Sequence, residues 1–407
     1  MSATNADMNS WVPVPDGSPF PVTNLPYGVV SRPGGRPQPA VAIGDHVLLL
    51  AVTAATGLLD GTLPDRSVFQ APTLNAFMAQ GRQVWHAVRE RLTGLLTDGR
   101  YARRLEHALL PRAEVRAHLP VEVADYVDFY AFEEHAANVG RIFRPDQPPI
   151  LPNWHHLPVG YHGRAGTVVV SGTPIVRPSG LRLIDGTPTF GPSLRLDIEA
   201  EVGFVVGTPS PTGRRVSTVD FDRHVFGAVL VNDWSARDIQ AFEYVPLGPF
   251  LGKSFATSVS PWIVPIEALA AAAIPAPTQD PKPYLAPAGS GYDLALAVDW
   301  NGTRVSRPPF AAGYWTPAQQ LAHITANGAG LRTGDLYASG TVSGPRPASG
   351  CFLELTWNGA EPVKLDDGAL RTFLEDGDTV TITATAPGAD GTTIGFGEVT
   401  GTIQPAN

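Results

Sequence analysis

Short apolar runs between glycines and prolines are the main pattern of the first 60 residues. Residues 41–43 and 47–52 are entirely apolar, and turn-forming residues lie close by. Runs of this length and composition are typical of short β-strands. The segment from residue 11 to about residue 60 therefore predicts a small barrel of short strands.

From residue 73 the spacing of the apolar residues becomes helical. Large apolar side chains recur at intervals of three and four between Leu74 and Leu96, as on one face of an amphipathic helix. Pro72 and Thr73 suit its start, and Gly99 follows its end. We expect one long helix here and two shorter ones, at residues 235–243 and 316–326.

Strand-like runs return from about residue 117 and continue to the C-terminus. The candidates are residues 167–170, 194–206, 224–231, 261–265, 292–300, 351–357 and 379–383. Many strands without regular alternation with helices favour a mostly antiparallel arrangement over a doubly wound sheet. We predict a mainly β fold of the α+β class, with an N-terminal domain of residues 1–118 and a larger domain of residues 119–407.

Composition and charge exclude several classes of partner. The 407 residues carry a formal net charge of -9, with no run of lysines or arginines. Nucleic acids and anionic membranes favour basic surfaces, so we expect neither as a partner. The single cysteine, Cys351, excludes an intrachain disulfide and a zinc site built from several cysteines, and it favours a reducing compartment.

The apolar segments also bear on the location of the protein. Residues 1–7 have neither the positive start nor the apolar core of a secretory signal. No segment approaches the roughly 18 consecutive apolar residues of a membrane span. We therefore expect a cytoplasmic protein with no membrane partner.

Two carboxylates set two residues apart are the first candidate for chemistry. Glu199 and Glu201 lie in the apolar run 194–206, where a strand would place them on one face together with Asp197. Like charges that are partly buried repel, and a bound cation would relieve the repulsion. The alternative is an edge strand with a solvated acidic face.

Two further acids have similar surroundings. Asp128 lies in an aromatic and apolar segment, and Asp233 follows the apolar strand candidate 224–231. With Glu199 and Glu201 they would supply the oxygen donors that suit Mg²⁺, Ca²⁺ or Mn²⁺ better than zinc. The spacing of the four acids along the chain does not by itself group them.

His135 and Lys253 are candidates for proton transfer and anion binding. His135 is near Asp128 in sequence and follows Glu133 and Glu134, which could orient its ring or raise its pKa. A structural histidine is the alternative.

Lys253 follows a glycine and precedes a serine, but the loop lacks the first glycine of a phosphate-binding loop and contains Pro249. A tight loop could instead aim the ammonium group at an anion, and a surface lysine on a turn is the alternative.

These residues lie within motifs that resemble the fumarylacetoacetase family. One is Asn-Asp-Trp-Ser-Ala-Arg-Asp-Ile-Gln at 232–240; the others lie at 125–130, 135–140, 151–164, 196–201, 250–255, 338–345, 373–378 and 394–397. The matches cover most of residues 120–400, and the first 118 residues match more loosely. The resemblance implies a small SH3-like N-terminal barrel, a large β-roll catalytic domain and a homodimer.

The resemblance also implies a role for each matching residue. The metal ligands are Asp128, Glu199, Glu201 and Asp233, and a second cation would lie near Lys253, Ala256 and Thr257. The base is His135, with Glu354 as its partner in the predicted strand 351–357. The groups that stabilise negative charge are Arg237, Gln240 and Lys253, and the substrate contacts are Tyr130, Arg144, Tyr161, Arg237, Gln240, Tyr244 and Thr341. Ala256 stands where animal members have glycine, so the Lys253 loop is expected to differ there.

The activity that the resemblance implies is hydrolysis of a carbon–carbon bond in a diketo acid. The substrate would be 4-fumarylacetoacetate and the products fumarate and acetoacetate, with a divalent cation and no organic cofactor. The alternatives are a β-keto-acid decarboxylase, hydratase or isomerase of the same superfamily, or a non-catalytic protein that binds small acids. A histidine with a carboxylate partner favours the hydrolase, because decarboxylation needs no activated water.

Overall fold

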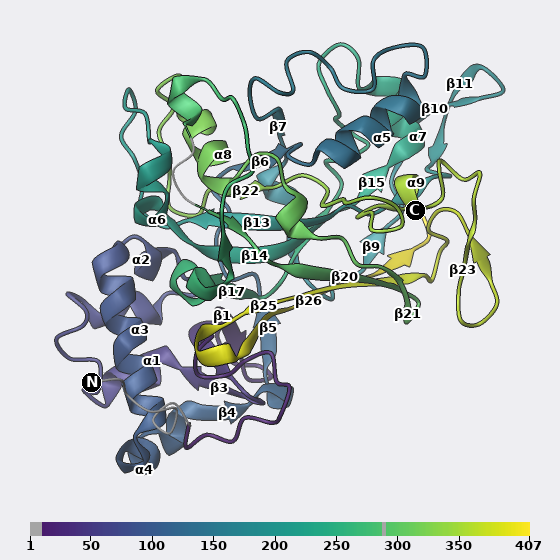
Figure 1. The fold of residues 1–407 in the computed structure, drawn as a ribbon. Helices are drawn as coiled ribbons and strands as arrows, with labels where there is room; N and C mark the ends of the chain where they lie inside the picture. The colour runs from purple at the N-terminus through teal and green to yellow at the C-terminus, as the bar shows by residue number, and fades with distance from the viewer. Residues whose placement is uncertain (1–9, 287–289) are drawn as a thin grey trace.

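The structure is a computed structural model that describes residues 10–286 and 290–407. Residues 1–7, on which the expectation of a cytoplasmic location partly rests, lie outside the described residues. An N-terminal unit lies at the bottom of Figure 1, and the longest strands of the chain reach down to it from the larger unit. No helix among the described residues is both long and apolar enough to cross a membrane.

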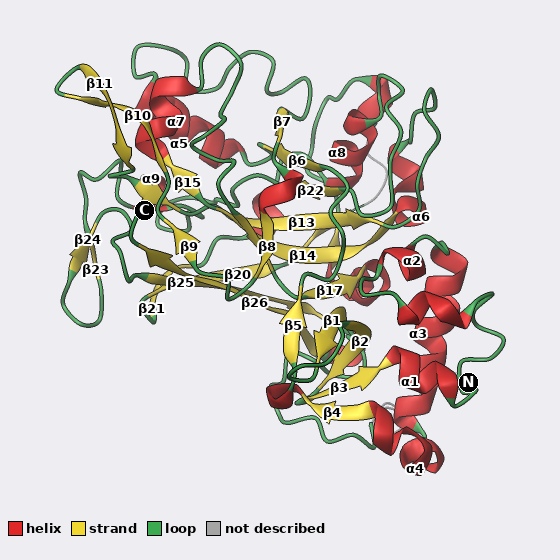
Figure 2. Cartoon of the chain, turned by 180° about the vertical axis from the view of Figure 1, so that it is seen from behind, coloured by secondary structure: helices red, strands yellow, loops and turns green. Residues whose placement is uncertain are grey.

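The N-terminal unit is a small antiparallel sheet with helices along one side (Figure 2). Its strands are β1 (Tyr27–Ser31), β2 (Gln38–Ile43), β3 (His46–Leu49), β4 (Leu109–Pro111) and β5 (Arg116–His118). Its helices are α1 (Leu50–Ala55), α2 (Asn75–Met78), α3 (Arg82–Thr97) and α4 (Ala102–Leu105). The predicted strand 47–52 is correct only as far as Leu49, where the chain enters α1.

The long helix predicted from residue 74 is interrupted. Helix α2 ends at Met78, and Gly81, the residue before α3, has φ 87° and ψ 168°, a non-helical conformation that glycine adopts readily. The indole of Trp85 donates a hydrogen bond to the carbonyl of Met78, at 2.9 Å, and fastens the two helices together. Helical spacing of the apolar residues continues across the break, which is why the spacing predicted one helix.

The N-terminal sheet continues into the larger unit. Strand β1 pairs with β17 (Trp262–Pro265), and the path then runs through β14 (Val225–Asp233), β13 (Ala200–Val206), β22 (Leu336–Ala338), β6 (Tyr126–Phe129) and β7 (Gly160–His162). Strands β8 (Val168–Val170) and β16 (Thr257–Val259) branch from it. This mixed sheet carries the acidic residues predicted from the sequence.

A second sheet of five strands packs beside the first. It consists of β9 (Ile175–Val176), β20 (Ala295–Trp300), β21 (Thr303–Ser306), β25 (Thr379–Pro387) and β26 (Thr393–Gln404). Four strand pairs complete the β-structure: β10 (Ser179–Ile184) with β11 (Thr187–Pro192), β12 (Leu196–Asp197) with β15 (Ser235–Ala236), β18 (Ala273–Ile274) with β19 (Gly291–Tyr292), and β23 (Val363–Lys364) with β24 (Leu370–Arg371).

Helices are more frequent than predicted, so the fold is a mixed α and β fold. The larger unit contains α5 (Glu133–Phe143), α6 (Phe221–His224), α7 (Arg237–Glu243), α8 (Pro317–Ile324) and α9 (Phe352–Leu355). The helices predicted at 235–243 and 316–326 are confirmed as α7 and α8. The strand predicted at 351–357 is wrong, because its middle forms α9, and a short, fully buried apolar run has no period that separates strand from helix.

The strand predicted at 194–206 is divided in two. Asp197 ends β12, which pairs with β15, and the chain then shifts to pair with β14 from Ala200 onward. The side chain of Asp197 accepts a hydrogen bond from the amide of Ile198 at this break. Asp197 therefore does not belong to the regular strand that carries Glu201.

Substitution of glycine by alanine is expected to have opposite effects on stability at two helical positions, Gly94 and Gly140. A Cβ atom on Gly140, in α5, would overlap the backbone carbonyl of Pro149, whereas a Cβ atom on Gly94, in α3, would meet nothing within 4 Å. Gly94→Ala should raise the free energy of unfolding by about 0.5–1 kcal/mol through helix propensity. Gly140→Ala should lower it by about 1–3 kcal/mol through overpacking. Urea unfolding measures both, and a stabilised Gly140→Ala variant would show that α5 is not packed against residue 149 as described.

Candidate active site

Three strands of the mixed sheet, β6, β13 and β14, bring four carboxylates to one place. Asp128 lies on β6, Glu201 on β13, Asp233 at the end of β14, and Glu199 directly before β13. Strand β22 pairs with both β6 and β13, and the amide of Asp233 donates to the carbonyl of Glu199 at 3.1 Å. All four side chains are buried, which excludes the solvated edge strand considered from the sequence.

The carboxylates differ in the partners that they have. Asp128, Glu199 and Asp233 can each place an oxygen within 4.8 Å of the others. Neither oxygen of Glu201 has a hydrogen-bond partner, and Oδ1 of Asp128 has none. Burial, together with the charges of the neighbouring acids, raises the pKa of both Glu201 and Asp128 well above the ordinary range. These unpartnered oxygens are free to bind a cation.

Two basic side chains face the carboxylates from the other side. Lys253 forms ion pairs with Glu199 and, at 3.1 Å, with Asp233. Arg237 donates from Nη1 to Glu199 at 2.7 Å and from Nε to Asp197 at 2.8 Å. Burial raises the pKa of Glu199, but the charges of Lys253 and Arg237 outweigh it and hold that pKa below its usual range.

The balance of buried charge indicates a missing positive charge. Five carboxylates are buried here, the four named above and Asp197, against two cationic side chains, Arg237 and Lys253. When all are ionised, the cluster carries an excess of negative charge in a medium where such charge is costly. A donor set made only of carboxylate oxygens fits Mg²⁺, Ca²⁺ or Mn²⁺. The residues present therefore fit a divalent cation.

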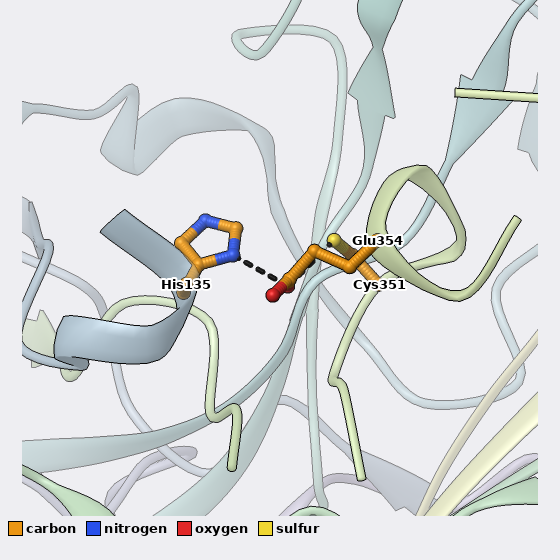
Figure 3. A group of neighbouring side chains, drawn as sticks. All are labelled: His135, Cys351 and Glu354. Carbon is orange, nitrogen blue, oxygen red and sulfur yellow. Dashed lines mark hydrogen bonds and ion pairs between the residues drawn. The ribbon is translucent and has the colours of Figure 1, made fainter. Parts of the chain in front are cut away.

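His135 lies on α5 and is held by Glu354 of α9 (Figure 3). Its Nδ1 is 2.6 Å from Oε2 of Glu354, and both side chains are buried. This hydrogen bond fixes the orientation of the imidazole ring, and Nε2 is the ring nitrogen that it does not occupy. Glu133, expected as a possible neighbour, instead pairs with the exposed His155 at 3.1 Å.

Three further donors hold Glu354 in place. Asn138 donates to Oε1 at 3.0 Å, and Ser343 and Cys351 donate to Oε2 at 2.8 and 3.1 Å. Burial alone would raise the pKa of Glu354, but His135 and these hydrogen bonds outweigh it and lower the pKa to about 2. Glu354 is therefore held as a carboxylate. Sequence reasoning assigned none of these three donors; the position of Asn138, three residues after His135 on one helix, was the available signal.

The predicted catalytic and substrate-contacting residues, except Glu354, line one cavity of about 350 Å³. Besides Asp128 and Glu199, the walls include His135, Arg237, Gln240, Lys253, Tyr130, Arg144, Tyr161, Tyr244 and Thr341. Glu201, Asp233 and Glu354 do not line the cavity. The apolar part of the wall, which the sequence did not indicate, includes Phe143, Ile150, Leu151, Val159 and Leu247.

Two polar groups in this wall are left without a partner. The hydroxyl of Thr341 and Nε of Arg144 are buried and make no hydrogen bond. The hydroxyl of Tyr161, in contrast, donates to Asp233 at 2.9 Å. The free groups can bind oxygen atoms of a ligand, which suits a small molecule with carboxylates.

The residues expected around a second cation lie beside the carboxylate cluster. The hydroxyl of Thr257 donates to Asp233 at 2.8 Å, and Ala256 is buried. Lys253, Thr257 and Asp233 also line a smaller cavity of about 180 Å³ next to the main one. Lys253 and Thr257 thus contact different oxygens of Asp233.

Solved structures with a similar fold include two hydrolases. A fumarylacetoacetate hydrolase from Exiguobacterium antarcticum has a TM-score of 0.55 at 17% identity, with 94% of this chain and 99% of that chain covered. A maleylpyruvate hydrolase from Sphingobium sp. SYK-6, solved with manganese (II) and pyruvate, has a TM-score of 0.53 at 17% identity, with 93% and 100% covered. At these identities the similarity shows the fold.

Sequence comparisons extend over nearly the whole chain. Residues 125–404 match the model of the fumarylacetoacetate hydrolase C-terminal domain, and residues 23–120 match that of the fumarylacetoacetase N-terminal domain. Fumarylacetoacetase of Homo sapiens is 46% identical over 415 residues, which cover 98% of this chain and 99% of the relative. Fumarylacetoacetase of Oryza sativa subsp. japonica is 46% identical over 425 residues, with 99% of each covered. The chain therefore belongs to the fumarylacetoacetase family.

Proposed function

We infer that this protein hydrolyses 4-fumarylacetoacetate to fumarate and acetoacetate, the last step of tyrosine and phenylalanine catabolism. The observation that carries this inference is that one cavity brings together His135, two carboxylates of the cluster, Asp128 and Glu199, and the cationic groups Arg237 and Lys253. Nearly full-length similarity to curated fumarylacetoacetases supports it. The buried His135–Glu354 pair can activate water, which favours hydrolysis over decarboxylation, since decarboxylation needs no activated water.

We propose that His135 is the general base. Glu354 accepts the Nδ1 proton, so the lone pair on Nε2 is available to take a proton from water. The hydroxide adds to a carbonyl of the diketo acid and forms a tetrahedral intermediate. Glu354 remains ionised and stabilises the imidazolium that results, as its lowered pKa requires.

Collapse of the intermediate breaks the carbon–carbon bond and releases a carbanion as an enolate, which becomes acetoacetate when it takes up the proton that His135 removed from water. Arg237, Gln240 and Lys253 are placed to donate hydrogen bonds to the developing charge. The side-chain oxygen of Gln240 accepts from Arg237 at 3.1 Å, which leaves its amide N–H groups for the substrate. When bound by Asp128, Glu199, Glu201 and Asp233, a divalent cation, Mg²⁺ or Ca²⁺ with Mn²⁺ as a further candidate, supplies Lewis-acid polarisation of the diketo oxygens.

We propose that the remaining polar residues of the cavity orient the substrate. Arg144 and Thr341 have unpartnered polar atoms, and Tyr130 and Tyr244 are the aromatic members of the set. Tyr161 would act mainly through its bond to Asp233. A second cation near Lys253, Ala256 and Thr257 belongs to the same proposal, as does the absence of an organic cofactor.

We further propose that residues 1–118 form an SH3-like barrel domain and residues 119–407 a β-roll catalytic domain. The change of sheet path between β5 and β6 and the limits of the two family models support this division. A cytoplasmic location is proposed on the single, buried cysteine.

We propose a homodimer that uses the β10–β11 hairpin and the loop after α7. Apolar side chains are exposed on both: Leu181, Leu183, Phe190 and Leu194 around the hairpin, and Phe242, Val245, Leu247, Phe250 and Leu251 around the loop. Gly180 of the hairpin approaches Ile239 of α7, so the two groups lie side by side (Figure 1). An exposed apolar surface of this kind is typical of a protein interface.

The activity is tested by following the loss of fumarylacetoacetate absorbance. We expect turnover by wild type, its loss with EDTA and its recovery with Mg²⁺ or Mn²⁺. His135→Ala should lower kcat by about 10²–10⁴-fold, because the base is lost. His155→Ala removes a comparable but exposed histidine–carboxylate pair and should retain activity. Turnover that resists EDTA, or full activity of His135→Ala, would overturn the mechanism.

The raised pKa of Glu201 predicts how stability depends on pH in the metal-free protein. Because the folded state favours the protonated carboxyl, its stabilisation is complete at low pH and is lost as pH rises through the raised pKa. The glutamine side chain of the Glu201→Gln variant carries no charge at any pH. Without metal, it should therefore melt at a higher temperature than wild type at about pH 8, with a smaller difference at about pH 5. Equal differences at both pH values in calorimetry would contradict the burial of an unpaired Glu201.

The dimer is tested by light scattering coupled to size-exclusion chromatography. Wild type should elute with twice the mass of the chain, and Phe190→Asp should shift it toward the monomer, because a charge cannot be buried unpaired in an apolar interface. Val219→Asp, at a valine of similar exposure outside these segments, should leave the mass unchanged. A monomeric wild type would refute the proposal.

A further inference from the structure

Asp197 is a fully buried carboxylate that the mechanism above does not use. It does not line the cavity and is not among the carboxylates that can approach one another within 4.8 Å. Yet both of its oxygens are saturated by hydrogen bonds from three different parts of the chain. Such a residue can act only through the groups that it holds.

The first of these groups is the short helix that carries Glu354. The amides of Phe352 and Leu353 donate to Asp197, at 2.7 and 3.0 Å, where the side chain of the helix's own N-cap, Cys351, makes no capping bond. Helix α9 has four residues and cannot be stable by itself. Its first amides need a partner from elsewhere, and Asp197 is that partner.

The second group is the guanidinium of Arg237. Its Nε donates to Asp197 at 2.8 Å, while Nη1 donates to Glu199 and to Gln240. Because the guanidinium is planar, holding Nε and one Nη group fixes the direction of every remaining N–H. Asp197 thus sets the orientation of a cationic group that faces the cavity.

We propose that Asp197 is a positioning residue that locks the water-activating pair and the enolate-stabilising arginine into one geometry. This inference rests on the proposed function. One carboxylate holds both the helix of Glu354 and Arg237, so a shift of either element is transmitted to the other. The pair that forms hydroxide and the arginine that stabilises the leaving enolate then keep a fixed position relative to each other and to the bond that breaks.

Only a carboxylate can satisfy this arrangement. The four donors to Asp197 are the amides of Ile198, Phe352 and Leu353 and the Nε of Arg237. An asparagine offers one accepting oxygen, and its NH₂ group would face two donors without an acceptor. Asp197→Asn therefore releases either α9 or Arg237 with little change in side-chain volume.

The test compares kcat and KM of Asp197→Asn with those of wild type. We expect kcat to fall by about 10²–10³-fold, as when one preorganised donor is lost, with KM changed by less than about threefold. Asp335→Asn is the matched control, since Asp335 also accepts a backbone amide, at 2.7 Å, and pairs with an arginine, at 3.4 Å. It should retain wild-type kcat. The thermal midpoints of both variants report the structural cost.

A double-mutant comparison separates positioning from general damage. Because Asp197 acts partly through Arg237, Asp197→Asn should lower kcat by a smaller factor in an Arg237→Met background than in wild type, with the remaining fall due to the helix of Glu354. Multiplicative effects of the two substitutions, or a lowered melting temperature with normal kcat, would overturn the proposal.

If Asp197→Asn does not fold, Asp197→Ser is assayed with added formate, which can replace the carboxylate; a rise in kcat supports the proposal. Failure of both variants to fold would assign Asp197 to folding and overturn it. Absence of turnover by wild type would instead refute the proposed function.

Discussion

Repulsion among carboxylates buried at one point of the mixed sheet is the constraint on which the site depends. The hydrogen-bonded partners available to these groups are unequal: Glu199 and Asp233 share Lys253, and Asp197 takes Arg237, whereas Glu201 has no partner. A buried carboxylate without a partner is costly, and the surrounding fold must hold it in place against that cost. Protonation of Glu201 and Asp128, whose pKa values are raised, relieves this repulsion, and so would a bound cation, which could also polarise a diketo substrate.

In this fold, rigid strands hold the carboxylates, and short helices carry the side chains that surround them. Strands β6, β13 and β14 hold the carboxylates at fixed separations, because their positions are set by the pairing of the sheet. Helices α5, α7 and α9 carry His135, Arg237 and Glu354. These side chains come from three segments spread over more than 200 residues of the chain, so their geometry depends on the contacts between elements. Asp197 is one such contact, and it explains how a helix of four residues can hold Glu354 in place.

The sequence predicted the acids better than their supports. Two glutamates in an apolar run indicated a cation site from charge and burial alone, and an aspartate after a buried strand was a reasonable second ligand. The link between His135 and Glu354 came only from family resemblance, because nothing in the local sequence around Glu354 indicates a partner 219 residues away. The same buried segment was predicted as a strand, since its helix depends on the distant Asp197.

The remaining errors have a similar cause. The break at Gly81 and the division of the run 194–206 at Asp197 both occur where the apolar pattern continues without interruption. In each case a backbone conformation or a change of strand partner decides the structure, and neither is encoded in the spacing of apolar residues. The apolar wall of the cavity was missed for a further reason: side chains such as Leu151 and Val159 cannot be distinguished from ordinary core residues in the sequence.

The central claim, that a cation balances the buried carboxylates, is tested most directly by anomalous scattering from crystals soaked in Mn²⁺. We expect one strong peak bounded by Asp128, Glu199, Glu201 and Asp233, with the oxygens of Glu201 within about 2.0–2.6 Å of it, the range for hard divalent cations. A peak confined to other residues, or none while Glu201 remains buried and unpartnered, would contradict the claim.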